Sequence, residues 1–261
     1  MSDLDLDHLE REGYVVVPNF LDREMTRRVR EHIDSLLPPV GVLHKEDPKR
    51  WHTVLRHPIP GAIMAELANN SALLELANQC LKPRELRLLE QVLIRSDPRP
   101  PPHGPLGWHV DWAFFPRHYK AVPLQTYFHM VHCLNTVSAG GAAFMIVPGS
   151  HHLTYTASAK METTEELAGF KRDPSGVAGV DTSEGIEVCP NEGDLLIFNP
   201  MALHSGSGNA TDQPRYVHFA SFFDTSATEL WNELRRTKYR DGFPDTLREN
   251  LSADLMPLLA W

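Results

Sequence analysis

The sequence predicts a mainly β protein of the jelly-roll kind with helices on its flanks. Short runs with the residue types of β-strands recur between about residues 86 and 223. Turn signals separate these runs, among them Ala139-Gly-Gly141, Pro148-Gly-Ser150 and Asn191-Glu-Gly193. The 261 residues show no linker, internal repeat or low-complexity tract, so one domain over 1–261 is the simplest organisation.

The N-terminal part, about residues 1–84, is expected to be mainly helical. Asp22 is the expected N-cap of one helix, and Pro83 ends another. The valines after Tyr14 favour a strand, because β-branched side chains suit a pleated sheet. The expected elements are helices over 4–13, 22–37 and 62–81 and a strand over 14–18.

A β core is expected over about 85–224, followed by a C-terminal helix over about 226–240. The polar segment 156–185 is predicted to be an inserted loop with a short helix. It is either a lid over a site or an ordinary surface loop. The predicted strands of the core are residues 86–94, 107–115, 124–134, 142–147, 186–188, 194–199 and 215–223.

Composition excludes several classes of protein. The formal net charge of −9 argues against nucleic acid or an anionic membrane as the main partner. No apolar run reaches the roughly 18 residues that cross a bilayer, and the N-terminus lacks the pattern of a signal peptide. Cys80, Cys133 and Cys189 lie far apart and form no CxxC pair, which argues against a disulfide framework. A cytoplasmic location is therefore expected.

The densest candidate for chemistry is Trp108-His109-Val110-Asp111-Trp112. Side chains at i and i+2 of a strand share a face, so His109 and Asp111 are expected to point the same way. One imidazole beside one carboxylate makes two thirds of the 2-His-1-carboxylate triad of non-haem Fe(II) oxygenases. The third ligand must then be a distant histidine. His204 is the best candidate, because it follows the predicted strand 194–199 and precedes a Ser/Gly turn.

Arg215 opens a predicted strand eleven residues after His204. A buried arginine offers a planar fork of N–H groups that binds a carboxylate through two hydrogen bonds. A dicarboxylate co-substrate that chelates iron through its keto acid end needs such an anchor at its other end.

The His-x-Asp pair, the distal His and the following Arg resemble the phytanoyl-CoA dioxygenase family of Fe(II)/2-oxoglutarate-dependent oxygenases. The intervening blocks Leu134-Asn135, Gly140-Gly141 and Phe144-Met-Ile-Val-Pro-Gly-Ser-His151 resemble that family's strand, turn and Pro-Gly-Ser-His segment. The resemblance is close over about residues 85–224 and implies a double-stranded β-helix. One departure is the turn Gly140-Gly141-Ala142, where many relatives show Asn-Gly.

The resemblance implies that His109, Asp111 and His204 bind Fe(II) and that Arg215 binds the far carboxylate of 2-oxoglutarate. Gln91 and Thr126 are further candidate contacts of 2-oxoglutarate. With O2, the implied reaction releases succinate and CO2 and hydroxylates or otherwise oxidises a substrate. Asp111 favours this outcome over halogenation, because halogenating relatives carry a small residue at that position.

The implied substrate is a small organic molecule, such as a natural-product intermediate, an amino acid-like solute or an acyl derivative. Two alternatives stay open. One is a non-oxygenase metal-binding jelly roll, such as a cupin-like isomerase or hydrolase that uses Zn or Mn. The other is a non-catalytic sensing module that keeps the fold.

The remaining histidines favour packing or surface roles. His129 and His132 have opposite strand parity, so at most one of them faces a cavity, and His218 points away from the face of Arg215. The cluster Arg50-Trp51-His52 with Arg56-His57 is interpreted as a solvated helix or loop face, with an anion-binding surface as the alternative.

Overall fold

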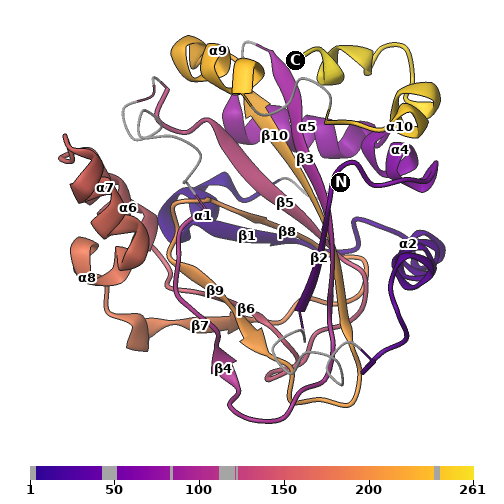
Figure 1. The fold of residues 1–261 in the computed structure, drawn as a ribbon, viewed down its shortest axis with the longest axis horizontal. Helices are drawn as coiled ribbons and strands as arrows, with labels where there is room; N and C mark the ends of the chain where they lie inside the picture. Colours follow the sequence, from indigo (N-terminus) through magenta and orange to yellow (C-terminus); the bar gives the residue numbers. More distant parts are fainter. Residues whose placement is uncertain (1–3, 43–51, 83–84, 112–120, 122, 238–241) are drawn as a thin grey trace.

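The computed structural model describes residues 4–42, 52–82, 85–111, 121, 123–237 and 242–261. Two antiparallel sheets curl around a shared interior (Figure 1), which confirms the predicted mainly β fold. In spatial order the large sheet holds β1 (Tyr14–Val17), β8 (Leu195–Phe198), β5 (Tyr127–Cys133), β10 (Arg215–Asp224), β3 (Leu86–Ser96) and β2 (His52–Arg56). The small sheet holds β4 (Gly104–Pro105), β9 (His204–Gly208), β6 (Phe144–Ile146) and β7 (Ile186–Val188).

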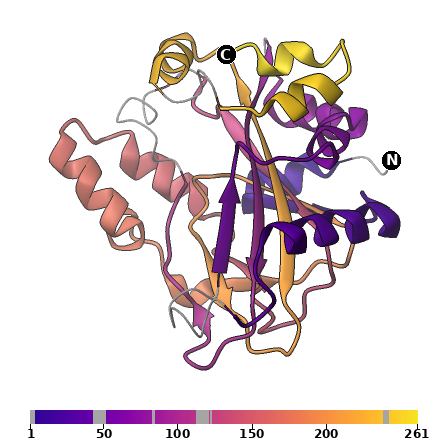
Figure 2. The same ribbon diagram turned by 45° about the vertical axis from the view of Figure 1, so that its right-hand side comes forward.

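Helices cover the outer face of the large sheet (Figure 2). Leu73 and Leu76 of α5 (Ser71–Leu81) belong to one apolar core with Met130 of β5 and Phe222 of β10. A neighbouring core joins α2 (Arg23–Leu36) and α4 (Ile63–Ala68) to Leu93 of β3. The C-terminal part adds α9 (Thr228–Thr237), α10 (Asp245–Asn250) and η3 (Met256–Leu259). One side of the large sheet is thereby closed, and the other side is left for the site.

Local signals in the sequence set several helix ends. Asp22 caps α2 by accepting a hydrogen bond from the backbone N–H of Met25 at 2.7 Å. Gly13 ends α1 (Leu6–Glu12) in the left-handed conformation. The single helix predicted over 62–81 is wrong, because α4 and α5 are separate. Asn70 breaks it: its side chain accepts from two backbone N–H groups at the start of α5, as an N-cap does.

The strand predictions were right for most of the core, but some strands formed where none was predicted. The segment 52–56 is the edge strand β2 rather than a helix or loop face. Residues 204–208 form β9, although Ser205–Asn209 has the composition of a turn. Gly208 suits this strand because the Pro-rich loop lies against it, where an added Cβ would meet the His103 backbone at 3.2 Å. The predicted strand 107–115 is described only to Asp111, which lies outside any named strand; the remainder falls outside the described residues.

The inserted segment is more helical than predicted. Residues 156–185 begin in the last turn of α6 (Ser150–Ser158) and contain α7 (Thr164–Arg172), α8 (Pro174–Ala178) and η2 (Thr182–Glu184). A capping box between Thr163 and Glu166 begins α7. Figure 1 shows these helices beside the sheets, and none of their residues is among the described lining of the central cavity. The structure therefore places these helices on a flank of the sheets, apart from the described lining of the cavity.

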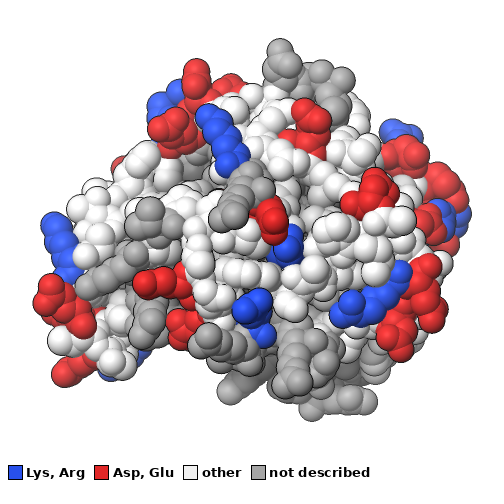
Figure 3. All heavy atoms as spheres, turned by 90° about the horizontal axis from the view of Figure 1, so that it is seen from above, with Lys and Arg blue, Asp and Glu red and all other residues white. Residues whose placement is uncertain are grey.

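The surface carries charges of both signs. Acidic and basic side chains are interspersed over the coloured part of the face in Figure 3, without a patch of one sign. Within the described parts of the chain, no helix has the length and apolar character that crossing a membrane requires.

Candidate metal centre and cavity

His109 and His204 are brought together by backbone pairing. The N–H of His109 donates to the carbonyl of His204 at 2.9 Å, and the N–H of His204 donates to the carbonyl of His109 at 3.0 Å. The imidazole rings lie side by side, with centroids 4.3 Å apart. The backbone N–H of Asp111 donates to the carbonyl of Pro200 at 2.8 Å, which holds the carboxylate next to the same two rings.

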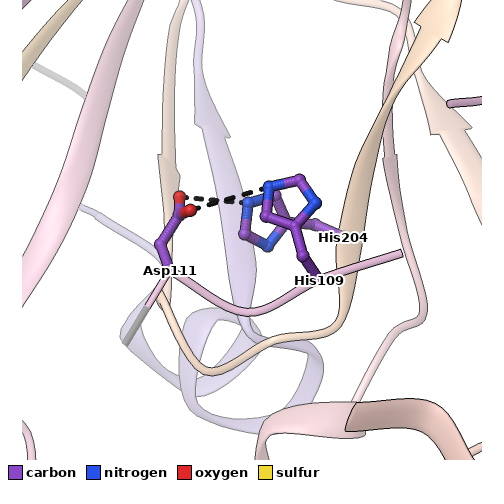
Figure 4. A group of neighbouring side chains, drawn as sticks. All are labelled: His109, Asp111 and His204. Carbon is purple, nitrogen blue, oxygen red and sulfur yellow. Dashed lines mark hydrogen bonds and ion pairs between the residues drawn. The ribbon is translucent and has the colours of Figure 1, made fainter. Parts of the chain in front are cut away.

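The three side chains converge on one point (Figure 4). Nε2 of His204 lies 3.1 Å from Oδ2 of Asp111, and Nε2 of His109 lies 3.6 Å from Oδ1. One ligand atom from each residue falls within 4.8 Å of the others. The side chain of His109 is 47% exposed and that of His204 only 5%, so the site opens on the side of His109.

Both histidines are oriented as metal ligands. Nδ1 of His109 lies 2.8 Å from the carbonyl of Gly107, and Nδ1 of His204 lies 2.8 Å from the carbonyl of Ala202. A carbonyl only accepts, so each Nδ1 carries the hydrogen and each neutral ring turns the lone pair of Nε2 toward Asp111. Such outer hydrogen bonds are typical of metal-bound histidine. Two nitrogen lone pairs facing a carboxylate fit a divalent cation such as Fe(II).

The pKa shifts of the cluster agree with a metal-binding role. Burial alone would raise the pKa of Asp111, but His204 and His129 outweigh that effect and hold the pKa well below its usual range. Burial, helped by the neighbouring His204, lowers the pKa of His109. An ionised carboxylate beside a neutral imidazole is the protonation state in which these groups bind a metal.

Arg215 lies at the start of β10 and faces the same cavity. Its Nη1 donates to the carbonyl of Ala142 at 2.7 Å, and no other hydrogen bond joins the guanidinium to the described residues. Ala142 itself has φ of 58° in the turn that departs from the family pattern. The guanidinium is therefore buried, charged and held at one end by that turn, which leaves N–H groups for an anion.

Gln91 and Thr126 are not brought to this site. The cavity face of β3 carries Glu90, Val92 and Ile94, so Gln91 lies on the opposite face. There its amide donates to the carbonyl of Met64 at 2.9 Å. Thr126 is buried beside β5 but is not among the cavity residues.

The cavity between the two sheets has a volume of about 620 Å³. Its floor is aromatic: the ring of Phe198 lies 4.9 Å from that of His204, and the ring of Phe144 lies 5.5 Å from it. The outer wall is the edge strand β2, whose His52, Val54 and Arg56 face inward. Part of the basic cluster thus lines the open cavity: His52 and Arg56 are exposed, as a solvated face requires, but they lie on a strand and not on the predicted helix or loop. Arg50 and Trp51 lie outside the described residues.

Two residues of the site were missed in the sequence. Ser150, in the Pro-Gly-Ser-His block, accepts through Oγ from the N–H of Leu203 at 2.8 Å and so fixes the residue before His204. His129 faces the cavity, with Nε2 3.2 Å from Oδ2 of Asp111. Strand parity indicated only that one of His129 and His132 could do so.

The sequence profile of the phytanoyl-CoA dioxygenase family matches residues 9–217. A curated protein of Stutzerimonas stutzeri, described as a probable alpha-ketoglutarate-dependent hypophosphite dioxygenase, is 26% identical over 144 residues. That match covers 55% of this chain and 47% of the relative, so the chain spans about half the length of the curated relative.

Solved structures show the same fold. The epimerase SnoN, solved with Fe3+, alpha ketoglutarate and nogalamycin RO, matches with a TM-score of 0.62 and 20% identity over 84% of this chain and 82% of that one. HygX from Streptomyces hygroscopicus, solved with nickel and 2-oxoglutarate, matches with a TM-score of 0.60 and 19% identity over 86% of this chain and 88% of that one.

Proposed function

This chain belongs to the phytanoyl-CoA dioxygenase family, and from that premise we propose that it is an Fe(II)- and 2-oxoglutarate-dependent dioxygenase that oxidises a small molecule. The family match, the curated relative and the solved relatives all support an enzyme of this class. The observation that carries the proposal is the convergence of His109, Asp111 and His204 in a cavity that also holds the buried Arg215.

Each of the four site residues has a distinct part in this function. His109, Asp111 and His204 would hold Fe(II), and Arg215 would bind the far carboxylate of 2-oxoglutarate. When bound, iron and 2-oxoglutarate together supply the activation of O2, with release of succinate and CO2. The residues contribute orientation, because the backbone pairing and the carbonyl-bound Nδ1 atoms preset both rings. The apolar floor around His204 keeps bulk water from that side.

The volume of the cavity supports a small-molecule substrate. A volume of about 620 Å³ lies in the range of ordinary ligand sites and has room for a co-substrate and a small partner molecule. We propose that the outcome is hydroxylation or a related oxidation of a natural-product intermediate, an amino acid-like solute or an acyl derivative. The retained Asp111 is the residue that supports this class of outcome.

We further propose that residues 1–261 act as one oxygenase domain. The N-terminal strands β1 and β2 form both edges of the large sheet. At the other end of the chain, the indole N–H of Trp261 donates to the carbonyl of Leu88 in β3 at 2.9 Å. Segments near both ends of the chain are therefore built into the large sheet, which forms one wall of the cavity.

The test is succinate formation against a panel of metabolites. The protein would be supplied with Fe(II), ascorbate, 2-oxoglutarate and O2, and succinate would be measured with each of the three substrate classes. The proposal expects one class to raise succinate above the substrate-free rate in the wild type and not in Asp111→Ala. Turnover of a panel compound that needs Zn or Mn and is indifferent to 2-oxoglutarate would replace it with the non-oxygenase alternative.

A further inference from the structure

A third imidazole contacts the proposed carboxylate ligand. His129 lies in the middle of β5 and is 4% exposed. Its Nε2 is 3.2 Å from Oδ2 of Asp111, and its Nδ1 is 2.7 Å from Oγ of Ser221 on the neighbouring strand β10. One ring thus bonds to the large sheet through Nδ1 and brings its buried Nε2, which no other described group satisfies, close to the carboxylate.

The strand pairing fixes the orientation of the His129 ring. His129 and Ser221 are directly opposed in the register of β5 and β10, so their side chains leave the sheet on the same face. The rings of Phe198 and Tyr127 flank the imidazole with centroids 4.9 and 5.1 Å away. The imidazole is therefore packed against two aromatic rings and cannot turn away from Asp111 without repacking its neighbours.

The partners of Nδ1 distinguish His129 from the two proposed ligands. In His109 and His204, Nδ1 faces a carbonyl and must donate, which leaves Nε2 with its lone pair. In His129, Nδ1 faces the hydroxyl of Ser221, which can donate to it. The carboxylate of Glu90, 4.0 Å from the same Nδ1, is too distant for a hydrogen bond. The hydrogen of the His129 ring can therefore sit on Nε2, opposite the carboxylate.

We propose that His129 is a positioning residue of the iron site: oriented by the hydroxyl of Ser221, it donates Nε2–H to the carboxylate of Asp111 and sets the rotation of that ligand. This assignment rests on the proposed function, because it takes Asp111 as an iron ligand. It explains why a histidine, and not an apolar side chain, lies in an otherwise aromatic floor. Outer hydrogen bonds of this kind typically alter metal affinity about 10- to 100-fold.

The experiment measures binding of Mn(II) alone by calorimetry in the full chain. His129→Leu is expected to weaken Mn(II) binding about 10- to 100-fold. His129→Gln, whose amide can still donate to Asp111, should retain most of the affinity, and Ser221→Ala should give a smaller loss than His129→Leu. His132→Leu is the matched control: it removes a buried imidazole from the same strand whose Nδ1 also bonds to β10, but on the opposite face.

Pulsed EPR of the Cu(II)-loaded protein supplies a second readout, the number of metal-bound imidazoles. Two in the wild type and two in His129→Gln support the assignment. Three in the wild type would make His129 a ligand and overturn it, as would Mn(II) affinity equal in wild type and His129→Leu. A wild-type chain that binds no Mn(II) would instead overturn the proposed function.

Discussion

His109 and His204 are a directly opposed cross-strand pair, in which each backbone N–H donates to the carbonyl of the other residue. The two residues are 95 positions apart in the chain. Their ring centroids are nevertheless 4.3 Å apart, because the backbone pairing places the two residues directly opposite each other. The two nitrogen ligands of the proposed centre are thus placed by backbone hydrogen bonds, and only their rotation depends on side-chain contacts.

Replacement of Arg215 should weaken the binding of 2-oxoglutarate. A charge-assisted hydrogen bond contributes about 1.5–3 kcal/mol, so Arg215→Ala should raise the KM for 2-oxoglutarate at least 10-fold. Arg215→Lys should give a smaller increase, since lysine keeps the charge and loses the planar fork. Steady-state succinate formation at varied 2-oxoglutarate measures both.

Arg95 is the matched control for Arg215. It is opposed to Tyr216 in the adjacent strand and is equally buried, but it forms ion pairs with Asp97 and Asp34. Arg95→Lys should reduce stability and leave the KM for 2-oxoglutarate unchanged. An unchanged KM in Arg215→Ala would remove Arg215 from the co-substrate site.

The apo protein should lose stability in mild acid because of His132 and His218. These rings lie on the outer face of the large sheet with their Nδ1 atoms 2.9 Å apart. Burial lowers the pKa of His132 to about 3 and that of His218 well below its ordinary value of 6.5. In the unfolded chain both take up protons below about pH 6.5, so the stabilisation is complete above that pH and is lost as the pH falls from 6.5 toward 3.

The measurement is the free energy of unfolding in urea between pH 7 and pH 4. Each proton bound only by the unfolded chain lowers it by about 1.4 kcal/mol per pH unit. The double variant His132→Leu/His218→Leu should show a shallower slope than the wild type. An undiminished slope would assign the acid sensitivity to other groups.

Gly193 should be intolerant of a side chain. Its φ is 89°, and an added Cβ would collide with the backbone oxygen of Leu21, whose own N–H donates to the Gly193 carbonyl at 2.8 Å. Left-handed backbone and overpacking together predict that Gly193→Ala lowers the free energy of unfolding by about 2–4 kcal/mol. Gly169→Ala, in α7 with open space around it, should instead be neutral or stabilising. Equal effects of the two substitutions would contradict this account of Gly193.

Much of the site could be predicted because the residues that carry it have local signatures. His109 and Asp111 stand two apart, His204 follows a predicted strand and Arg215 opens one. These positions, together with the family resemblance, singled out four residues that do face the cavity. His129 could not be assigned in this way. Its role depends on Asp111, which approaches from a distant segment.

The placement of Gln91 and the strands β9 and β2 could not be predicted, for physical reasons. Gln91 is opposed to Ala220, which packs in the core on the outer face of the large sheet, so both side chains point away from the cavity. Alternation within one strand shows which residues share a face, but not which of the two faces meets the cavity. β9 was missed because Ser and Gly indicate turns, whereas at Gly208 the close approach of the Pro-rich loop favours a glycine within a strand. Edge strand β2 is only half-buried and has little apolar pattern to detect.

The most direct test of the iron site is the visible absorption of the protein mixed with Fe(II) and 2-oxoglutarate without oxygen. Chelation of the keto acid at the iron should produce a weak charge-transfer band in the wild type, and His109→Ala should abolish it while the chain stays folded. Absence of the band in the wild type, or a band of full strength in His109→Ala, would contradict the assignment of His109, Asp111 and His204 as the centre that binds iron and 2-oxoglutarate.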